Sequence, residues 1–331
     1  MWFNNISKDS DVVISSRIRF ARSIEGYKFP HILNSKELNN IITLVDRAID
    51  KDEYKLFMMR DIDEVTQNAL KEQHLISKEF VGNDNGAIVA NADNTIVAMI
   101  NEEDHLRIQA FESGFNIDKC YDKICQFTDD INEKIKFAKS DKYGYLISCP
   151  TNIGSAMRVS VMLHLPALSK MKLLNKLFDQ AMEIGISVRG LYGENSDSTG
   201  NIFQISNQKT LGVSDEDIIY NVKLVVTSII EQERKAREAL LNSGITLEDT
   251  IYRSYGILKN ARTIDNDEAI KLLSNVRLGV STNVISDLSL DKIQTLMINI
   301  EPNTLRTILK EEFDEKEENI KRAEYIRKEL I

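Results

Sequence analysis

Apolar and polar residues alternate along residues 158–165 (RVSVMLHL), and this period of two is typical of a β-strand with one buried face. Residues 86–101 (GAIVANADNTIVAMIN) predict two short strands around an Asn-Ala-Asp-Asn turn, and residues 143–148 (YGYLIS) predict a further strand. Residues 186–193 (ISVRGLYG) and 201–208 (NIFQISNQ) flank a glycine-containing loop and predict another hairpin. Because hairpins join strands that run in opposite directions, we expect an antiparallel sheet.

Helical patterns lie between and after these strands. Residues 168–185 are amphipathic and end at Gly185, a residue type that commonly follows the last turn of a helix. A longer helix is expected to begin at Ser214, because Asp217 three residues later gives a start that resembles a capping box. Apolar residues then recur at helical spacing, and the pattern continues toward residue 240.

The pattern changes near residue 240, which we take as a domain boundary. After Gly244 the chain shows helical segments without strand signals. We therefore predict an α+β fold in which residues 1–240 form an antiparallel sheet flanked by helices and residues 241–331 form a small all-α domain. The sequence contains no Walker-type loop and no strand-GxGxxG-helix unit, so the common nucleotide-binding folds are not indicated.

The composition is that of an ordinary globular protein, since 42% of the 331 residues are hydrophobic and 28% are charged. The net charge of −9 argues against bulk attraction to nucleic acid or to an anionic membrane, so any phosphate must be held by locally placed cations. The three cysteines show neither metal-ligand spacing nor a disulfide framework, and we expect no metal bound by protein ligands. Without a signal peptide or a transmembrane run, the expected location is cytoplasmic.

Five arginines lie at the ends of predicted strands or in the loops that join them: Arg17, Arg19, Arg107, Arg158 and Arg189. The guanidinium group is planar and permanently charged, so a set of arginines suits an oligophosphate ligand. Any one of them, taken alone, is more often a solvated surface residue. The loop that follows Arg189 is likewise open to two interpretations, a simple hairpin turn or a phosphate-side loop.

Five segments with arginines, carboxylates or polar side chains follow one another along the chain: SSRIRFAR (15–22), INEEDHLRIQ (100–109), CPTNIGSAMRVSVMLHLP (149–166), RGLYGE (189–194) and FQISNQKTLG (203–212). In this order they resemble the ATP:guanido phosphotransferases, the family of creatine and arginine kinases. The resemblance extends over roughly residues 12–230. The short N-terminus, the EQHLIS segment at residues 72–77 and the helical C-terminus resemble the bacterial protein-arginine kinase branch of that family.

The resemblance implies that the five arginines bind the phosphates of ATP, which is used with Mg²⁺. It also implies that Glu103 and Glu194 hold the guanidinium that accepts the phosphoryl group, with Cys149 as the family's reactive cysteine beside it. Further residues implied to contact the nucleotide are Ser15, Ser16, Ile18, His74, Val159, Ser160, Val161, Met162, Gly190, Leu191, Tyr192, Gly193 and Glu194 itself.

These residue types suit phosphoryl transfer to a guanidine. A guanidinium has a pKa above about 12 and is a poor nucleophile while it is protonated. Two carboxylates can bind its N–H groups, and one can take a proton as the N–P bond forms. Arginines and magnesium can neutralise the charge of the transferred group, and magnesium is held mainly by phosphates and water.

Other roles stay open for several of these residues. Glu102 and Asp104, which flank Glu103, could belong to a solvated acidic turn, as charge runs usually do. Cys149 could be a small buried residue rather than a thiolate whose pKa is lowered by nearby cations. His74 could have an ordinary structural role.

The acceptor is expected to be a protein. Small-guanidine kinases that resemble this family close an N-terminal domain over the acceptor, and this chain has no such segment, so its site should be more open. The resemblance implies protein substrates that present arginine, an activator subunit, a Clp-type protease system and a homodimeric state, without membrane contact. A small-guanidine kinase and a non-catalytic adaptor for a repressor or activator are the alternatives, although an adaptor would not need the arginines and glutamates.

The C-terminal region departs from the branch that it resembles. That branch carries an Arg-Asp-x-x-Arg-Ala motif, which forms a regulatory pocket that senses phosphoarginine. The matching residues here keep Arg322 and Ala323 but place Glu318 and Asn319 where arginine and aspartate are expected. A glutamate reverses the local charge, so we do not expect phosphoarginine to bind in the same way. The alternative is a solvated, charged helix end.

Overall fold

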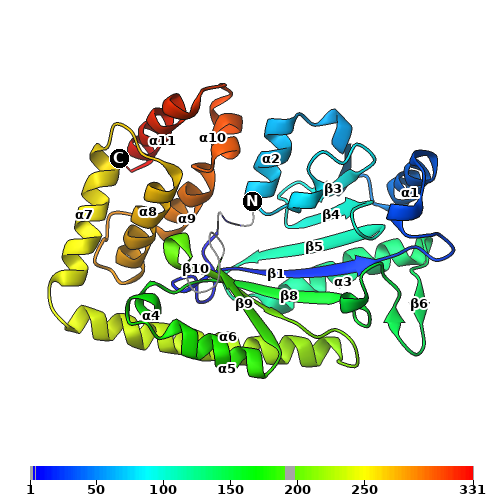
Figure 1. The fold of residues 1–331 in the computed structure, drawn as a ribbon, viewed down its shortest axis with the longest axis horizontal. Helices are drawn as coiled ribbons and strands as arrows, with labels where there is room; N and C mark the ends of the chain where they lie inside the picture. Colours follow the sequence, from blue (N-terminus) through cyan, green and yellow to red (C-terminus); the bar gives the residue numbers. More distant parts are fainter. Residues whose placement is uncertain (1–2, 4, 191–197, 331) are drawn as a thin grey trace.

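The computed structural model describes residue 3, residues 5–190 and residues 198–330. An eight-stranded sheet forms its centre, with the order β2-β3-β4-β5-β1-β8-β10-β9 (Figure 1). All neighbouring strands in this sheet are antiparallel, which confirms the predicted sheet type. The strands are β1 (Val13–Arg22), β2 (Tyr54–Met58), β3 (Ala87–Asn91), β4 (Ile96–Ile100), β5 (Leu106–Ser113), β8 (Met157–His164), β9 (Ile186–Gly190) and β10 (Ile202–Asn207).

Both predicted hairpins are confirmed, since β3 pairs with β4 and β9 pairs with β10. The strand predicted over residues 143–148 is much shorter. Only β7 (Gly144–Tyr145) is extended, and it pairs with β6 (Lys139–Ser140) outside the main sheet. The reason is that the chain leaves the hairpin after Tyr145, and the amide of Ser148 donates to Asp104 at 2.7 Å instead of to a strand.

One face of the sheet packs on several helices. Side chains such as Ile18 of β1 and Val159 of β8 alternate with polar neighbours and lie in an apolar core with α3 (Ile117–Lys134) and α6 (Asp215–Asn242). Burial of this face accounts for the period of two along the central strands. It also means that the intervening polar side chains all point to the opposite face.

The opposite face is covered in part. Met59 and Phe80 share an apolar cluster with Val97 and Met99 of β4, and helices of the C-terminal region cover one end of the face. There, Met162 and His164 of β8 are 8% and 0% exposed, and Met162 shares a second apolar cluster with Ile270 of the C-terminal region. The prediction that residues 158–165 form a half-buried strand is therefore wrong. Helices from the end of the chain cover its second face, a contact between distant segments that local periodicity cannot show. At the other end, this face carries the polar site described below.

The helix predicted over residues 168–185 is in fact two helices. These are α4 (Pro166–Lys170) and α5 (Leu174–Glu183), separated by Lys172 in a left-handed conformation with φ of 58°. The start of α4 is fixed because Glu233 accepts hydrogen bonds from two of its backbone amides, at 3.1 and 3.0 Å. Helix α5 packs along β9 instead, so the chain turns between these two attachments.

Two predicted helix ends are confirmed. Gly185 follows α5 with φ of 79°, a conformation that glycine adopts without steric cost. Ser214 caps α6, because its Oγ accepts a hydrogen bond from the amide of Asp217 at 3.1 Å. The remaining helices of this part are α1 (Ser35–Ala48) and α2 (Glu64–Glu72).

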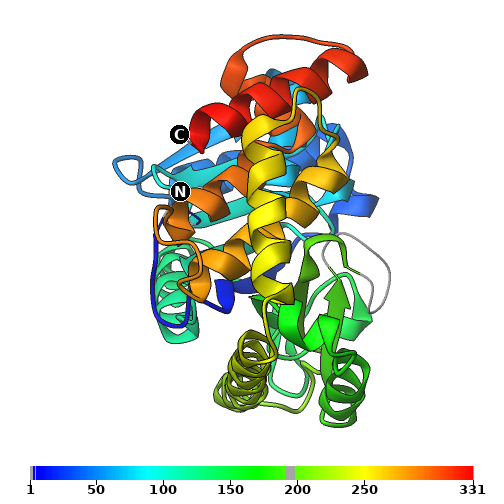
Figure 2. The ribbon, with the colours of Figure 1, turned by 90° about the vertical axis from the view of Figure 1, so that its left-hand side faces the viewer.

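The described C-terminal region, residues 243–330, contains helices joined by loops and no strand, as predicted; the helices are α7 (Thr246–Asn260), α8 (Asn266–Ser281), α9 (Leu290–Asn299), α10 (Pro302–Leu309) and α11 (Glu315–Glu329). Figures 1 and 2 show these helices against one end of the sheet, with α10 beside α2. Helix α6 runs through the boundary that we predict at residue 240 and links the two parts. Within the described residues, no helix combines the length and apolar character needed to cross a bilayer.

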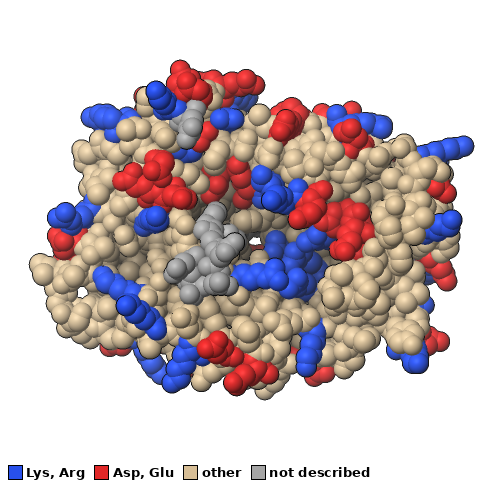
Figure 3. All heavy atoms as spheres, in the orientation of Figure 1, with Lys and Arg blue, Asp and Glu red and all other residues tan. Residues whose placement is uncertain are grey.

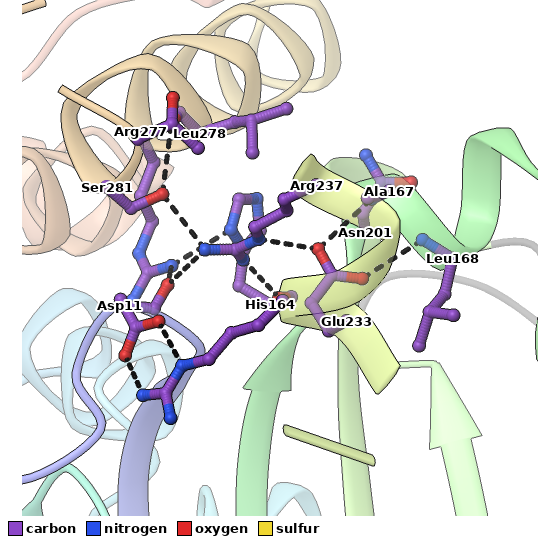
Figure 4. A network of polar contacts seen from close by, with 12 residues as sticks. Asp11, His164, Ala167, Leu168, Asn201, Glu233, Arg237, Arg277, Leu278 and Ser281 are labelled. Carbon is purple, nitrogen blue, oxygen red and sulfur yellow. Dashed lines mark hydrogen bonds and ion pairs between the residues drawn. The ribbon is translucent and has the colours of Figure 1, made fainter. Parts of the chain in front are cut away.

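A buried polar network joins this helical region to the sheet (Figure 4). Arg277 of α8 donates to Nδ1 of His164 at 2.9 Å, and Nε2 of His164 lies 2.8 Å from the hydroxyl of Ser274. Arg237 of α6 donates to the His164 carbonyl at 3.0 Å and pairs with Glu233 at 2.7 Å. Burial, and then the charges of Arg277 and Arg237, hold the pKa of His164 well below its usual value. His164 is therefore a neutral structural residue.

Candidate active site

The strand register places four of the predicted phosphate-binding arginines on one face of the sheet. Arg17 and Arg19 alternate with core residues along β1. Strand β8 pairs with one edge of β1 and places Arg158 directly opposite Arg19. Strand β5 pairs with the other edge and places Arg107 opposite Ala21. Side chains of cross-strand partners point to the same face, so these arginines converge although they are distant in sequence.

Arg189 reaches the same face from the edge of the sheet. In the strand register, Arg189 is opposite Gln204 of β10, and Gln204 is opposite Met162 of β8, whose side chain lies on the arginine face. The side chain of Gln204 accepts a hydrogen bond from Nη2 of Arg17 at 2.8 Å. The Arg17 guanidinium also lies 5.8 Å from the centroid of the Phe111 ring. Gln204 and Phe111 therefore fix Arg17 between β10 and β5.

The positive charges on this face disfavour one another. Burial, followed by the charges of Arg107 and Arg158, lowers the pKa of Arg17 to about 9. Burial is also the main reason why the pKa values of Arg19 and Arg158 are lowered, and neighbouring arginines add to it. The buried Nε atoms of Arg19 and Arg158 have no hydrogen-bond partner within the described part of the chain. A bound anion would offset the repulsion and pair these donors.

Arg19, Arg107 and Arg158 line a cleft of about 180 Å³ together with Glu103. Figure 3 shows Lys and Arg side chains gathered near the middle of the face, beside a group of Asp and Glu. A larger groove of about 710 Å³ lies between α5 and α6, but its basic lining residue, Lys223, is already in an ion pair. A second, smaller hollow on the arginine face is lined by Ser15, Arg17, His74, Phe111, Ser160, Met162 and Gln204.

Glu102 holds one of the arginines in place. Its carboxylate forms an ion pair with Arg107 and accepts a hydrogen bond from the hydroxyl of Ser77 at 2.6 Å. The Glu102 side chain is only 7% exposed. The alternative of a solvated turn is therefore wrong for Glu102, because its carboxylate is a buried partner of Arg107, one of the arginines predicted to bind phosphate.

Asp104 and Glu103 have opposite surroundings. Asp104 is 3% exposed and accepts hydrogen bonds from the Ser148 amide at 2.7 Å and the Ser23 hydroxyl at 3.1 Å. Burial raises the pKa of Asp104, and these two hydrogen bonds oppose that shift. Glu103 is exposed, and its carboxylate has no hydrogen-bond partner within the described ranges. The two buried carboxylates thus anchor the loop, and Glu103 is the one available to a ligand.

Cys149 follows the residue that binds Asp104, so it lies close to the acidic loop. The thiol is half-buried, and its Sγ lies 3.0 Å from the hydroxyl of Thr151. Cys149 is therefore not a core residue, in contrast to Cys120, which is fully buried. Its predicted role beside the acceptor stays a prediction.

His74 lies in the smaller hollow beside Arg17. Its backbone is left-handed, with φ of 61°. Burial, and then the charge of Arg17, lower the pKa of His74 to about 4. The imidazole is therefore neutral near pH 7 and adds no charge to the arginine face.

Several residues predicted to contact the nucleotide point away from the arginines. Ser16 donates its hydroxyl proton to the Gly114 carbonyl at 2.8 Å, and Ile18, Val159 and Val161 are fully buried in the core behind the sheet. They alternate with the residues that do face the site, which are Ser15, Ser160 and Met162. Gly190 ends β9, and four predicted residues lie outside the described ranges: Leu191, Tyr192, Gly193 and Glu194.

The sequence did not single out Gln204, Phe111 or Ser77. Each acts through another residue, since Gln204 and Phe111 contact Arg17 and Ser77 binds Glu102. Only the order and register of the strands bring them to the arginines. Gln204 and Ser77 carried a signal, because each stands within a segment that resembles the kinase family, whereas Phe111 lies outside those segments.

The predicted regulatory residues are buried. Arg322 is 1% exposed and pairs with Glu318 at 2.5 Å, and it also donates to Asn319 at 2.7 Å. Glu318 additionally pairs with Arg306 of α10 at 2.9 Å. The alternative of a solvated helix end is therefore wrong, and Ala323 beside it is likewise in the core. Glu318 and Asn319, the two residues that depart from the expected motif, themselves bind the Arg322 guanidinium.

Residues 37–236 match the model of the ATP:guanido phosphotransferase C-terminal catalytic domain, and residues 244–331 match that of the protein-arginine kinase McsB C-terminal domain. A protein-arginine kinase of Clostridium acetobutylicum is 44% identical over 336 residues, covering 99% of each chain. That of Clostridium tetani is 39% identical over 333 residues, covering 99% of this chain and 98% of the relative.

Solved structures of guanidino kinases share the fold. A duplicated taurocyamine kinase of Schistosoma mansoni, with bound components of a transition-state analogue, superposes with a TM-score of 0.62 and 28% identity. The match covers 70% of this chain and 34% of that one. A lombricine kinase gives a TM-score of 0.61 at 24% identity, over 72% of this chain and 69% of its own, and supports the fold alone. The predicted fold class is confirmed.

Proposed function

The chain belongs to the protein-arginine kinase family and is an ATP-dependent arginine kinase, and we propose that it phosphorylates arginine side chains of proteins through the cleft lined by Glu103. The main support is that the arginines converge with one exposed carboxylate on a single face of the sheet, while Arg19 and Arg158 have no carboxylate partner within the described residues. This arrangement offers cations for the phosphates of ATP beside an anion for the acceptor guanidinium.

The arginines supply electrostatic stabilisation. Arg19, Arg107 and Arg158 line the cleft and hold the phosphoryl oxygens, while Arg17 and Arg189 extend the same face toward β10. Mg²⁺ enters as part of the ATP substrate, held by phosphate oxygens and water.

Glu103 binds the acceptor and takes its proton. A guanidino nitrogen attacks the γ-phosphorus, the N–P bond forms, and the bond from phosphorus to the bridging oxygen of ADP breaks. The proton released by the nitrogen passes to a carboxylate, for which Glu103 is exposed and free of other partners within the described ranges. As the family resemblance implies, Glu194 would hold the guanidinium together with Glu103, and Cys149 would lie beside it.

We propose the cellular role that the resemblance implies. Phosphoarginine would mark cytoplasmic proteins for a Clp-type protease during stress and protein quality control, and an activator subunit would assist. The helical region, which we place at residues 241–331 after a catalytic domain at 1–240, would mediate homodimerisation. Because Arg322 is already paired, this region would not sense phosphoarginine through that residue.

The test is phosphorus NMR of the purified chain with Mg-ATP, comparing free L-arginine with an arginine-rich unfolded protein as acceptor. An acid-labile phosphoramidate signal on the protein alone supports the proposal. A signal on free arginine as well would favour a small-guanidine kinase. No signal with either acceptor, with ATP binding confirmed and an activator subunit present, would favour a non-catalytic adaptor.

A further inference from the structure

The segment that follows β1 packs against the acidic loop that carries Glu103. His105, two residues further along, accepts a hydrogen bond at Nδ1 from the Ile24 amide at 3.0 Å. Its Nε2 lies 2.9 Å from the Lys28 carbonyl oxygen. The ring of Tyr27 meets the His105 ring edge-on, with the centroids 6.2 Å apart. The segment that follows β1 is therefore held beside the loop that carries the exposed carboxylate of Glu103.

The loop that leads to Cys149 contacts both the acidic loop and the segment that follows β1. The Ser148 amide donates to Asp104 at 2.7 Å, and the Ser148 hydroxyl lies 3.5 Å from Nδ1 of His31. His31 belongs to the short helical turn Pro30–Ile32. These contacts bring the chain around Leu146, two residues before Ser148, to that turn and to the acidic loop.

Apolar surface is exposed along these segments. Ile32 is 58% exposed, Tyr27 is 42% exposed and Leu146 is 37% exposed. Phe29 is half-buried and stacks on His31, with ring centroids 6.2 Å apart. We call Tyr27, Phe29, Ile32 and Leu146 the acceptor shelf.

A protein acceptor must cross the surface around Glu103. Consecutive Cα atoms are about 3.8 Å apart, so the three residues on each side of a target arginine stay within about 11 Å of its Cα. The exposed charges between β1 and the turn, Glu25 and Lys28, are of opposite sign. The stretch between β1 and the turn therefore carries no net charge that could select a substrate, and its apolar side chains offer the contact surface for a bound polypeptide.

We infer that the acceptor shelf binds apolar side chains that flank the target arginine in an unfolded protein. The inference rests on the proposed function, because the shelf continues the acceptor side of that cleft. Leucine and phenylalanine beside an arginine are usually buried in a folded protein and become available when it unfolds. The shelf would thus favour unfolded substrates over surface arginines of folded ones.

The test uses two peptides with the same central arginine and the same net charge, one with leucine and phenylalanine at the second and third positions on each side, the other with serine. We expect kcat/KM to be about tenfold higher for the apolar peptide. In the double variant Ile32→Ser and Leu146→Ser, this advantage should fall to about twofold or less, with an unchanged KM for ATP. The matched control is the double variant Ile184→Ser and Ile245→Ser, exposed isoleucines outside the shelf, which should keep the full preference.

Three results would overturn the inference. The first is equal use of both peptides by the unmodified chain, and the second is a shelf variant that loses activity on both to the same extent. The third is a change in sedimentation of the shelf variant, which would make this surface an interface between two copies of the chain. If neither peptide is phosphorylated although ATP binds, the proposed function fails and the shelf fails with it.

Discussion

The carboxylate of Glu72 caps the first turn of α10. One oxygen accepts hydrogen bonds from the amide and hydroxyl of Thr304 at 2.7 and 2.9 Å, and the other accepts from the amide and side chain of Asn303 at 3.1 and 2.6 Å. Glu72 ends α2 and is two residues from His74, which lies beside Arg17 in the smaller hollow. The C-terminal region is thereby fastened to the segment that borders the arginine face.

Glu72→Gln should weaken this attachment and reduce ATP affinity together. Glutamine keeps one acceptor oxygen and loses the charge, so we expect the free energy of unfolding to fall by about 2 kcal/mol. The KM for ATP should rise about threefold because the segment at His74 loses a support. Urea unfolding and steady-state kinetics measure both, with Glu79→Gln at an exposed site as the control. A loss of stability without any change in KM would limit Glu72 to a structural role.

Glu103→Gln and Glu102→Gln should separate proton transfer from nucleotide binding. Removing the exposed carboxylate should lower kcat by about 10²- to 10⁴-fold and leave ATP affinity nearly intact. Removing the charge that pairs with Arg107 should instead raise the KM for ATP by about tenfold, since that arginine loses its buried partner. Initial rates with varied ATP distinguish the two. Equal effects of both substitutions on the KM for ATP would place Glu103 outside the acceptor site.

Cys149→Ser should slow the reaction without unfolding the protein. The thiol is half-buried and bonds only to the nearby Thr151 hydroxyl within the described residues, so we expect the free energy of unfolding to change by less than about 1 kcal/mol. Thermal unfolding and the rate of phosphoramidate formation measure the two effects. A large drop in melting temperature would show that the thiol is a packing residue after all.

Glu318→Ala should destabilise the C-terminal region. It would leave Arg322 buried without its ionic partner, at a cost of about 3 kcal/mol. Calorimetric titration of phosphoarginine into the unmodified chain should show no binding that depends on Arg322, because Glu318 already occupies its guanidinium. Saturable binding that disappears in Arg322→Lys would contradict this expectation.

The stability of the protein should depend on pH through His164. Its pKa is lowered in the folded state, so below about pH 6.5 the unfolded chain binds a proton that the folded chain does not. The stability that neutral His164 contributes is therefore complete above about pH 6.5. It is lost as the pH falls, by about 1.4 kcal/mol per pH unit. Urea unfolding between pH 5 and 8 should give a shallower slope for His164→Gln, which leaves Arg277 and Arg237 in place. Identical slopes would show that another group titrates.

The sequence could reveal elements whose pattern is local. The hairpin at residues 86–101, the helix that begins at Ser214 and the helical end of the chain are all in place. The break at Lys172 could not be read, because it results from the attachment of α4 to Glu233, more than sixty residues away. Amphipathic periodicity continues across such a break without interruption.

At the site, the sequence motifs identified the arginines but did not predict how these side chains are arranged in space. Their convergence depends on the position of β1 between β5 and β8, which no local pattern encodes. The same limit explains why Glu102 and Asp104 looked like solvent-exposed charges, since their partners Arg107 and Ser148 become neighbours only in the folded chain.

The central position of β1 has a consequence for how the protein is made. Ser15 pairs with Ser113 on one side, and Ile18 pairs with Val159 on the other. Strand β1 leaves the ribosome before both of its partners, so one edge stays unpaired until β5 has been synthesised and the other until β8, near residue 160, has followed. A chain that stalls before β8 would expose an open strand edge next to the arginine face, where other nascent chains can pair with it.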